Sequence, residues 1–313
     1  MPRIRRSVST ALSAATLLAL AACSAGGSDE GAAVSEGDPD ACPSEVVDVV
    51  VSVGQWGDLV EQLGGDCATV TTIVSSGAVD PHDFEPGTAD LAAFSDADLV
   101  VVNGAHYDEW AEDAIATLDP APAVVSAADV AGIFTEGADP HLWVDPAVVP
   151  EVAGAVADAL ASLSGEDGGY LAKQEGVVAG DISGYLETVA ELRGVAAGRT
   201  YVATEGVVNR LADAVGLTDV TPTGYQRAAS NDSEPAPGDL VAFEAALADG
   251  SADVLIYNTQ TSGSVPEQLR AAAEAAEVPV VEVSESPVDA TGSFTEWQSA
   301  QVQRLIDALS GTP

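Results

Sequence analysis

Apolar residues along the chain occur in two patterns, short continuous runs and longer segments with helical spacing, and the two patterns alternate. Short runs rich in Val, Ile and Leu, bounded by Gly, Asp and Ser, are typical of buried strands. Longer segments with apolar residues at every third or fourth position are typical of amphipathic helices. We predict strands at residues 46–53, 67–76, 98–104, 121–129, 199–204, 218–226, 252–259 and 278–285. We predict helices at residues 54–65, 87–97, 108–118, 205–217, 238–250, 265–277 and 294–311.

The alternation of strands and helices predicts an α/β fold, because parallel strands need crossover helices that cover both faces of the sheet. It is interrupted once, between residues 145 and 194, where no strand pattern occurs. The second part of this region is one helical segment of about 25 residues, which corresponds to about 40 Å at about 1.5 Å per residue. We therefore predict two lobes, each a parallel sheet flanked by helices, joined by one long spine helix.

The N-terminus carries a different signal. Arg3, Arg5 and Arg6 precede a short apolar run, which is typical of a signal peptide and too short for a well-formed spanning helix. The run ends in Leu-Ala-Ala-Cys at Cys23 and looks like a bacterial lipobox. Cleavage there would leave Cys23 lipid-modified, so that the protein would be extracytoplasmic and anchored to the outer face of the cell membrane. An ordinary signal peptide, with Cys23 incidental, is the alternative.

These patterns divide the chain into five segments. The stretch after Cys23 is rich in Gly, Ser and acidic residues, so we expect a disordered tether. The predicted segments are a lipoprotein signal peptide (1–22), the tether (23–44), an N-terminal α/β lobe (45–148), linking helices including the spine (149–198) and a C-terminal α/β lobe (199–313).

Charge and cysteine content narrow the function further. The formal net charge is −40, and such a surface repels nucleic acid and favours cations, although solubility alone explains it equally well. We expect no nucleic-acid partner. Two further cysteines, Cys42 and Cys67, belong to an exported chain, which favours a disulfide bridge between them. Free thiols or a thiolate metal site are the alternatives, and the spacing is unlike that of zinc-cysteine motifs.

Four side chains that suit a metal ion follow predicted strands. His82 and His141 each follow Asp-Pro, whereas Glu205 and Glu285 come directly after strands of the second lobe. Ligands in α/β folds gather at the carboxyl ends of strands, so the four could converge on one cleft between the lobes. Imidazole and carboxylate together suit Mn²⁺, Fe²⁺ or Zn²⁺. Taken singly, the histidines could bond loop carbonyls, and Glu205 could be a carboxylate favoured by a helix dipole.

Four segments resemble landmarks of a known family. DPHDFEPGTADLAAFSDADLVVVNG, DPHLWVDP, TEGVVNRLADAVGL and VPVVEVSE look like those of the zinc/manganese-binding solute-binding lipoproteins of ABC importers. The resemblance implies the TroA-like solute-binding fold, with ligands at His82, His141, Glu205 and Glu285. Glu282 is the alternative for the last ligand. The family usually shows an acidic residue where Asn258 stands.

The resemblance also implies a function. The protein would be a monomer that binds one divalent ion outside the membrane and delivers it to an ABC permease and its ATPase. A surface adhesin or scaffold of the same fold is an alternative. A metal-dependent hydrolase is disfavoured, because the chain has no HExxH or GxSxG motif and four protein ligands leave little room for an open coordination position.

The remaining residues refine the predicted site. Two histidines with two carboxylates form a harder donor set than three histidines, which favours Mn²⁺, with Zn²⁺ or Fe²⁺ as alternatives. Asp145 would either orient a histidine ligand by accepting its other ring N–H or cap a helix. His106 follows a strand, so we expect it near the cleft but not on the metal.

Overall fold

The structure is a computed structural model that describes residues 32–75, 77, 84–135, 137–165, 169–231, 233–261, 263–287 and 292–311. The predictions for the signal peptide, Cys23 and His82 lie outside the described residues. Within them, strands and helices alternate as the sequence predicts, and the interruption between the two sheets is helical.

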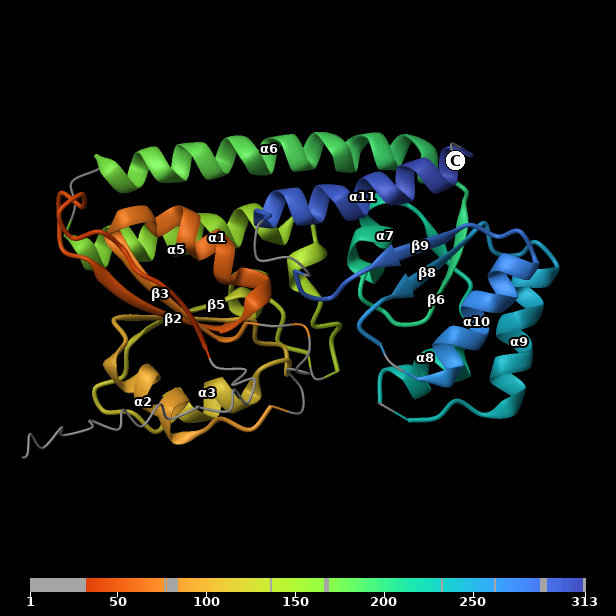
Figure 1. The fold of residues 1–313 in the computed structure, drawn as a ribbon, viewed down its shortest axis with the longest axis horizontal. Coiled ribbons are helices and arrows are strands. Elements are labelled where there is room, and N and C mark those ends of the chain that lie inside the picture. The colour runs from red at the N-terminus through yellow and green to blue at the C-terminus, as the bar shows by residue number, and fades with distance from the viewer. Residues whose placement is uncertain are drawn as a thin grey trace, which may run out of the picture. The chain divides into compact units, whose positions relative to one another are not determined.

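The first sheet has five strands in the order β1-β3-β2-β4-β5, and its strands run parallel except β1. The strands are β1 (Ala33–Ser35), β2 (Val47–Val53), β3 (Ala68–Val74), β4 (Leu99–Val102) and β5 (Ala123–Ser126). Helices α1 (Gly54–Gly64) and α5 (Val148–Ser164) cover one face, whereas α2 (Thr88–Asp96) and α3 (Glu109–Ala116) lie on the other (Figure 1). The short α4 (Ala127–Val130) follows β5. We call this sheet and its helices the N-terminal lobe.

The second sheet has four parallel strands in the order β7-β6-β8-β9. The strands are β6 (Thr200–Ala203), β7 (Thr218–Asp219), β8 (Val254–Asn258) and β9 (Val280–Val283). Helices α8 (Thr223–Ala229), α9 (Pro237–Ala248) and α10 (Ser264–Ala275) lie on the side away from the long helix, and α7 (Asn209–Val215) lies toward it (Figure 1). We call this sheet and its helices the C-terminal lobe.

Two long helices run side by side along both lobes. The spine helix α6 (Tyr170–Ala196) has 27 residues, and α11 (Phe294–Ser310) packs against it (Figure 1). The buried positions of α6 recur at intervals of three, four or seven residues, so one stripe faces the protein: Leu171, Val178, Ile182, Tyr185, Val189, Leu192 and Ala196. In the described part of the chain, no helix combines the length and apolar character needed to cross a membrane.

The larger of two hydrophobic clusters extends from one lobe into the other, whereas the smaller one, which includes Phe243 and Leu255, lies within the C-terminal lobe. The larger cluster includes Val51 of β2, Val152 of α5 and Leu192 of α6, and it continues through Ile256 of β8 and Leu305 of α11. A closely packed interior resists shear, because interdigitated side chains leave few voids to move into. The lobes are therefore held by packed side chains as well as by the chain itself.

The prediction of a disordered tether is wrong for residues 32–44. Ala33–Ser35 forms β1, which pairs antiparallel with β3. Cys42 and Cys67 form the disulfide that the sequence favoured, with an S–S distance of 2.01 Å. Composition alone misses this order, because β1 is stabilised by the unpaired edge of β3 and by the bridge, both distant in sequence.

The predicted strand at 218–226 is also corrected. Only Thr218–Asp219 is extended, and helix α8 begins at Thr223 directly after Pro222. Proline has no N–H to donate to a ladder, and its fixed φ suits the start of a helix. The helix predicted from residue 205 begins only at Asn209, so Glu205 lies in the loop before it.

Candidate metal centre

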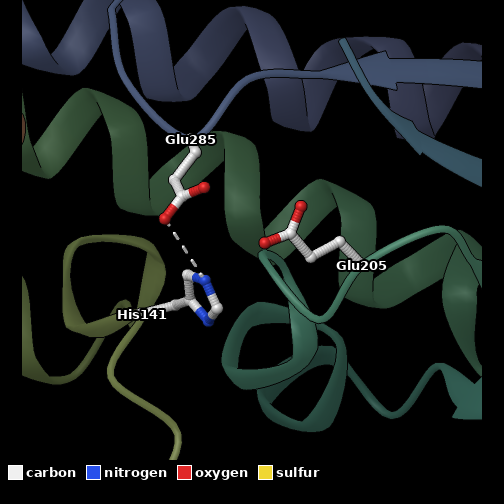
Figure 2. Close-up of side chains that lie close together, drawn as sticks. All are labelled: His141, Glu205 and Glu285. Atoms are coloured by element: carbon white, nitrogen blue, oxygen red, sulfur yellow. Dashed lines mark ion pairs between the residues drawn. The ribbon is translucent and has the colours of Figure 1, made fainter. Parts of the chain in front are cut away.

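Three predicted ligands from three separate segments meet at one point. His141 precedes the short 3-10 turn η2 (Leu142–Val144) of the N-terminal lobe. Glu205 follows β6 and Glu285 follows β9, at the carboxyl ends of two parallel strands of one sheet that β8 separates. Each offers one ligand atom, and these atoms all lie within 4.8 Å of one another (Figure 2). His82 lies outside the described residues, so its place in this centre stays a prediction.

The His141 side chain is oriented by its own Asp-Pro-His turn. One oxygen of Asp139, Oδ1, accepts from the His141 backbone N–H at 3.0 Å and contacts ring Nδ1 at 2.6 Å. The other ring atom, Nε2, is buried, has no hydrogen-bond partner among the described residues and lies 3.7 Å from Oε1 of Glu285 (Figure 2). A carboxylate on Nδ1 fixes the ring and leaves Nε2 as the atom available to a metal.

Asp139, rather than Asp145, is therefore the partner of the histidine. Asp145 Oδ1 accepts from the backbone N–H of Ala147 at the start of α5, and its other oxygen lies 3.6 Å from Nη1 of Arg210. The side chain of Asp145 does not cap α5 either, because the N-cap of that helix is Ala147 and it has no side-chain cap; Asp145 instead closes a turn onto Ala147. The sequence carries a signal for this role of Asp139, because an aspartate side chain readily accepts a hydrogen bond from the backbone N–H two residues later, which here belongs to His141.

The carboxylates keep His141 protonated while no metal is bound. Burial lowers the pKa of the imidazole, but the hydrogen bond to Asp139 and the nearby Glu285 outweigh it and raise that pKa to about 10. A cation at Nε2 would take the place of the proton, because metal ligation needs the neutral ring.

Glu205 is held by two donors. Its Oε2 accepts from Asn258 Nδ2 at 2.6 Å and from the Thr261 hydroxyl. Burial raises the pKa of Glu205 and the charge of Glu285 raises it further, against the opposing effect of the two hydrogen bonds. Asn258 ends β8, and the sequence analysis gave it no role. Two buried carboxylates that repel each other are relieved by a shared cation.

We expect Asn258→Ala to weaken metal binding by about 10- to 100-fold, the usual cost of removing a group that orients a ligand. The loss arises because Glu205 is no longer held toward His141. Isothermal titration of the metal-free protein measures it. Asn231→Ala is the matched control, because Asn231 is exposed and its side chain donates to the carbonyl of Arg227. Equal affinity in both variants would contradict the assigned role.

Glu285 belongs to the C-terminal lobe, but its carboxylate is held by side chains of the N-terminal lobe. The Tyr107 hydroxyl donates to its Oε1 at 2.8 Å, and that hydroxyl accepts from Gln55 Nε2 at 2.7 Å. Gln55 belongs to α1 and Tyr107 to the loop after β4, so both donors come from the N-terminal lobe. The Glu285 carboxylate is thus fixed across the junction between the lobes.

The loop around Glu285 is fastened on each side by a glutamine. Ser284 N–H donates to Gln301 Oε1 of α11 at 2.7 Å, and Ser286 N–H donates to Gln260 Oε1 at 2.7 Å. Because both flanking amides are satisfied, the loop has little freedom to turn the carboxylate away. The packing of α11 therefore contributes to the geometry of the centre.

Two other residues, Glu282 and His106, are not members of the ligand group. Glu282 is exposed on β9 and pairs with Nη1 of Arg270 at 2.7 Å, so Glu285 and not Glu282 joins the cluster. The His106 side chain is 55% exposed and pairs with Glu109. His106 is not part of the ligand group found among the described residues.

The donor set fits a divalent transition metal. It comprises one imidazole nitrogen and two carboxylate oxygens, the mixture that suits such ions. The unpartnered Nε2 of His141 is the strongest indication, since a buried polar atom without a partner is costly unless it has a ligand. His141 comes from one lobe and the glutamates from the other, so a bound ion would join the lobes (Figure 2).

Comparison with known proteins supports this interpretation. The family model of the zinc-uptake complex component A, periplasmic (ZnuA), matches residues 49–308. The high-affinity zinc uptake system protein ZnuA of Bacillus subtilis is 23% identical over 274 residues, 82% of each chain. The manganese-binding lipoprotein MntA of Halalkalibacterium halodurans is 34% identical over 104 residues, which cover 32% of this chain and 34% of that protein. That match therefore spans about a third of the relative's length.

A solved structure shows the same fold. The periplasmic zinc-binding protein TroA of Treponema pallidum superposes with a TM-score of 0.71 at 19% identity, covering 84% of this chain and 99% of that one. The predicted fold class is thus confirmed. Proteins of the matched family are substrate-binding components of transport systems rather than enzymes, which removes the hydrolase alternative.

Proposed function

This chain belongs to the family of the periplasmic component A of zinc-uptake complexes, and on that premise we propose that it captures one divalent transition metal for an ABC importer. His141, Glu205 and Glu285 bind the ion, and His82 completes the set. The observation that carries the proposal is the buried, unpartnered Nε2 of His141 facing two carboxylates. A permease with its ATPase receives the ion, and the protein acts as a lipid-anchored monomer held outside the cell membrane by Cys23.

The proposed donor set is most compatible with manganese. Two imidazoles and two carboxylates form a hard donor set, whereas dedicated zinc sites favour thiolate and imidazole nitrogen. The net charge of −40 attracts cations of any kind toward the protein, so it favours capture without selecting the metal. Selectivity between metals then depends on the donor atoms. At position 205 the donor is the carboxylate oxygen of Glu205, whereas a histidine there would offer an imidazole nitrogen.

Metal titration tests the proposal. The purified protein, stripped with chelator, is expected to bind one Mn²⁺ and to melt several degrees higher with it, because a ligand that binds only the folded state stabilises that state. Glu205→His is expected to shift the preference toward Zn²⁺. Glu282→His, at an exposed position on β9, is the control and should leave the preference unchanged. The proposed function would be refuted if the protein bound neither Mn²⁺ nor Zn²⁺.

A further inference from the structure

Arg210 connects the C-terminal lobe to the loop that carries His141. Its Nε donates to the carbonyl oxygen of Asp139 at 2.9 Å, and Nη2 donates to the same oxygen. Its Nη1 lies 3.6 Å from Oδ2 of Asp145. The side chain is only 18% exposed, although it belongs to the first turn of α7. One guanidinium therefore holds both ends of the segment 139–145, with His141 between them.

The contact acts on the same residue that orients the histidine. The Asp139 carboxylate fixes the His141 ring, while the Asp139 carbonyl is held by Arg210. Glu205 lies five residues before Arg210, in the loop that leads into α7. The arginine thus ties one end of the Glu205 loop to the His141 turn through Asp139 and Asp145 rather than through either ligand.

A guanidinium fork suits this task better than another cation. Its planar donors fix direction as well as distance, and less rotamer freedom is lost per bond than with an ammonium. Charge-assisted hydrogen bonds are also the stronger kind. The fork on the Asp139 carbonyl therefore restrains the separation of the two loops before any ion arrives.

We propose that Arg210 is a positioning residue that keeps His141 and Glu205 at ligating distance in the metal-free protein, so that the site is formed before the metal binds. This inference rests on the proposed function, because it concerns the geometry of the same centre. Ligands that are already in place lose less freedom when the ion binds, which raises the affinity. We expect the effect mainly in the dissociation rate, because affinity differences between closely related sites are mostly differences in that rate.

A matched arginine supplies the control. Arg193 of α6 makes the same kind of fork, with Nε and Nη2 donating to the carbonyl of Ala214 at 3.2 and 3.0 Å. Ala214 lies near the other end of α7, inside the C-terminal lobe. Arg210→Gln removes the fork at the centre, whereas Arg193→Gln removes an equivalent fork remote from it. Arg210→Lys keeps the charge but not the planar fork.

The experiment measures three quantities on the full chain. Amide hydrogen exchange at residues 139–145 of the metal-free protein reports the tie itself. Stopped-flow release of Mn²⁺ to a chelator gives the dissociation rate, and the visible spectrum of the Co²⁺ form reports ligand geometry. Arg210→Gln and Arg210→Lys are expected to speed exchange and metal release by about tenfold, the lower end of the usual cost of removing a group that orients a ligand, and to change the Co²⁺ spectrum. Arg193→Gln should behave as wild type.

Three results would overturn the inference. Arg210→Gln could bind metal as tightly as wild type or more tightly, the latter meaning that the guanidinium acts on the ion by repulsion. Alternatively, Arg193→Gln could lose as much, meaning that the effect is general loosening of α7. If wild type bound no metal, the proposed function would fail, whereas unchanged exchange at 139–145 in Arg210→Gln would separately refute the tie.

Discussion

Replacing His141 with alanine is expected to abolish tight metal binding while leaving both sheets folded. The substitution removes the single nitrogen donor found in the ligand group of the described residues. It also leaves Glu205 and Glu285 facing each other without a neighbouring imidazolium. We expect a loss of affinity of more than about 100-fold, beyond the usual cost of changing a group that only orients a ligand.

Calorimetric titration of Mn²⁺ and Zn²⁺ measures this loss, and circular dichroism of the metal-free variant checks the fold. The matched control is His106→Ala, because His106 is a surface histidine paired with Glu109 and outside the ligand group. If both variants bound metal equally well, the centre would have to lie elsewhere. If His141→Ala failed to fold, His141→Gln would test the same point with a side chain of similar length.

Removing the disulfide is expected to produce the largest loss of stability without loss of metal affinity. Cys42 and Cys67 are 25 residues apart, and closing such a loop restricts the unfolded chain by about 3.5 kcal/mol in the chain-entropy model. The double variant Cys42→Ala/Cys67→Ala should therefore melt roughly 10 °C lower. Affinity should persist, because the bridge lies at the start of β3, whereas the metal centre lies beyond the carboxyl ends of the strands.

Differential scanning calorimetry of the metal-free protein measures the change in melting temperature. Ser44→Ala is the control, since Ser44 lies beside Cys42 Sγ at 3.5 Å and outside the bridge. An unchanged melting temperature in the double variant would mean that the unfolded chain is already restricted by other structure. A parallel loss of metal affinity would mean that order at β1 and β3 reaches the centre.

The order of strands and helices could be predicted from the sequence because each element carries its own period. The apolar run of β2 and the recurring buried residues of α6 are local signals that tertiary contacts reinforce. β1 could not be predicted, because three residues gain their order only from the edge of β3. The segment from Thr218 was misjudged for the opposite reason, since Pro222 is a local stop signal that outweighs the extended pattern around it.

The candidate ligands and the residues that hold them also differ in how well the sequence predicts them. The cluster of His141, Glu205 and Glu285 could be predicted because both glutamates directly follow strands and all three residues belong to recognisable motifs. Asn258 could not, because its contact with Glu205 joins residues 53 positions apart. Arg210 was missed as well, since a guanidinium on a helix start is usually solvated and its acceptor is a backbone carbonyl with no signature in the sequence.

The position of α11 has a consequence for the order in which the molecule is assembled. Asp58 of α1 accepts the backbone N–H of Phe294, and the rest of the helix lies along the spine. Gln301 of the same helix fastens the Glu285 loop. The last 17-residue helix therefore completes both the shared core and the metal centre. A chain in which both sheets have formed but α11 has not docked therefore still lacks one of the two hydrogen bonds that fasten the Glu285 loop.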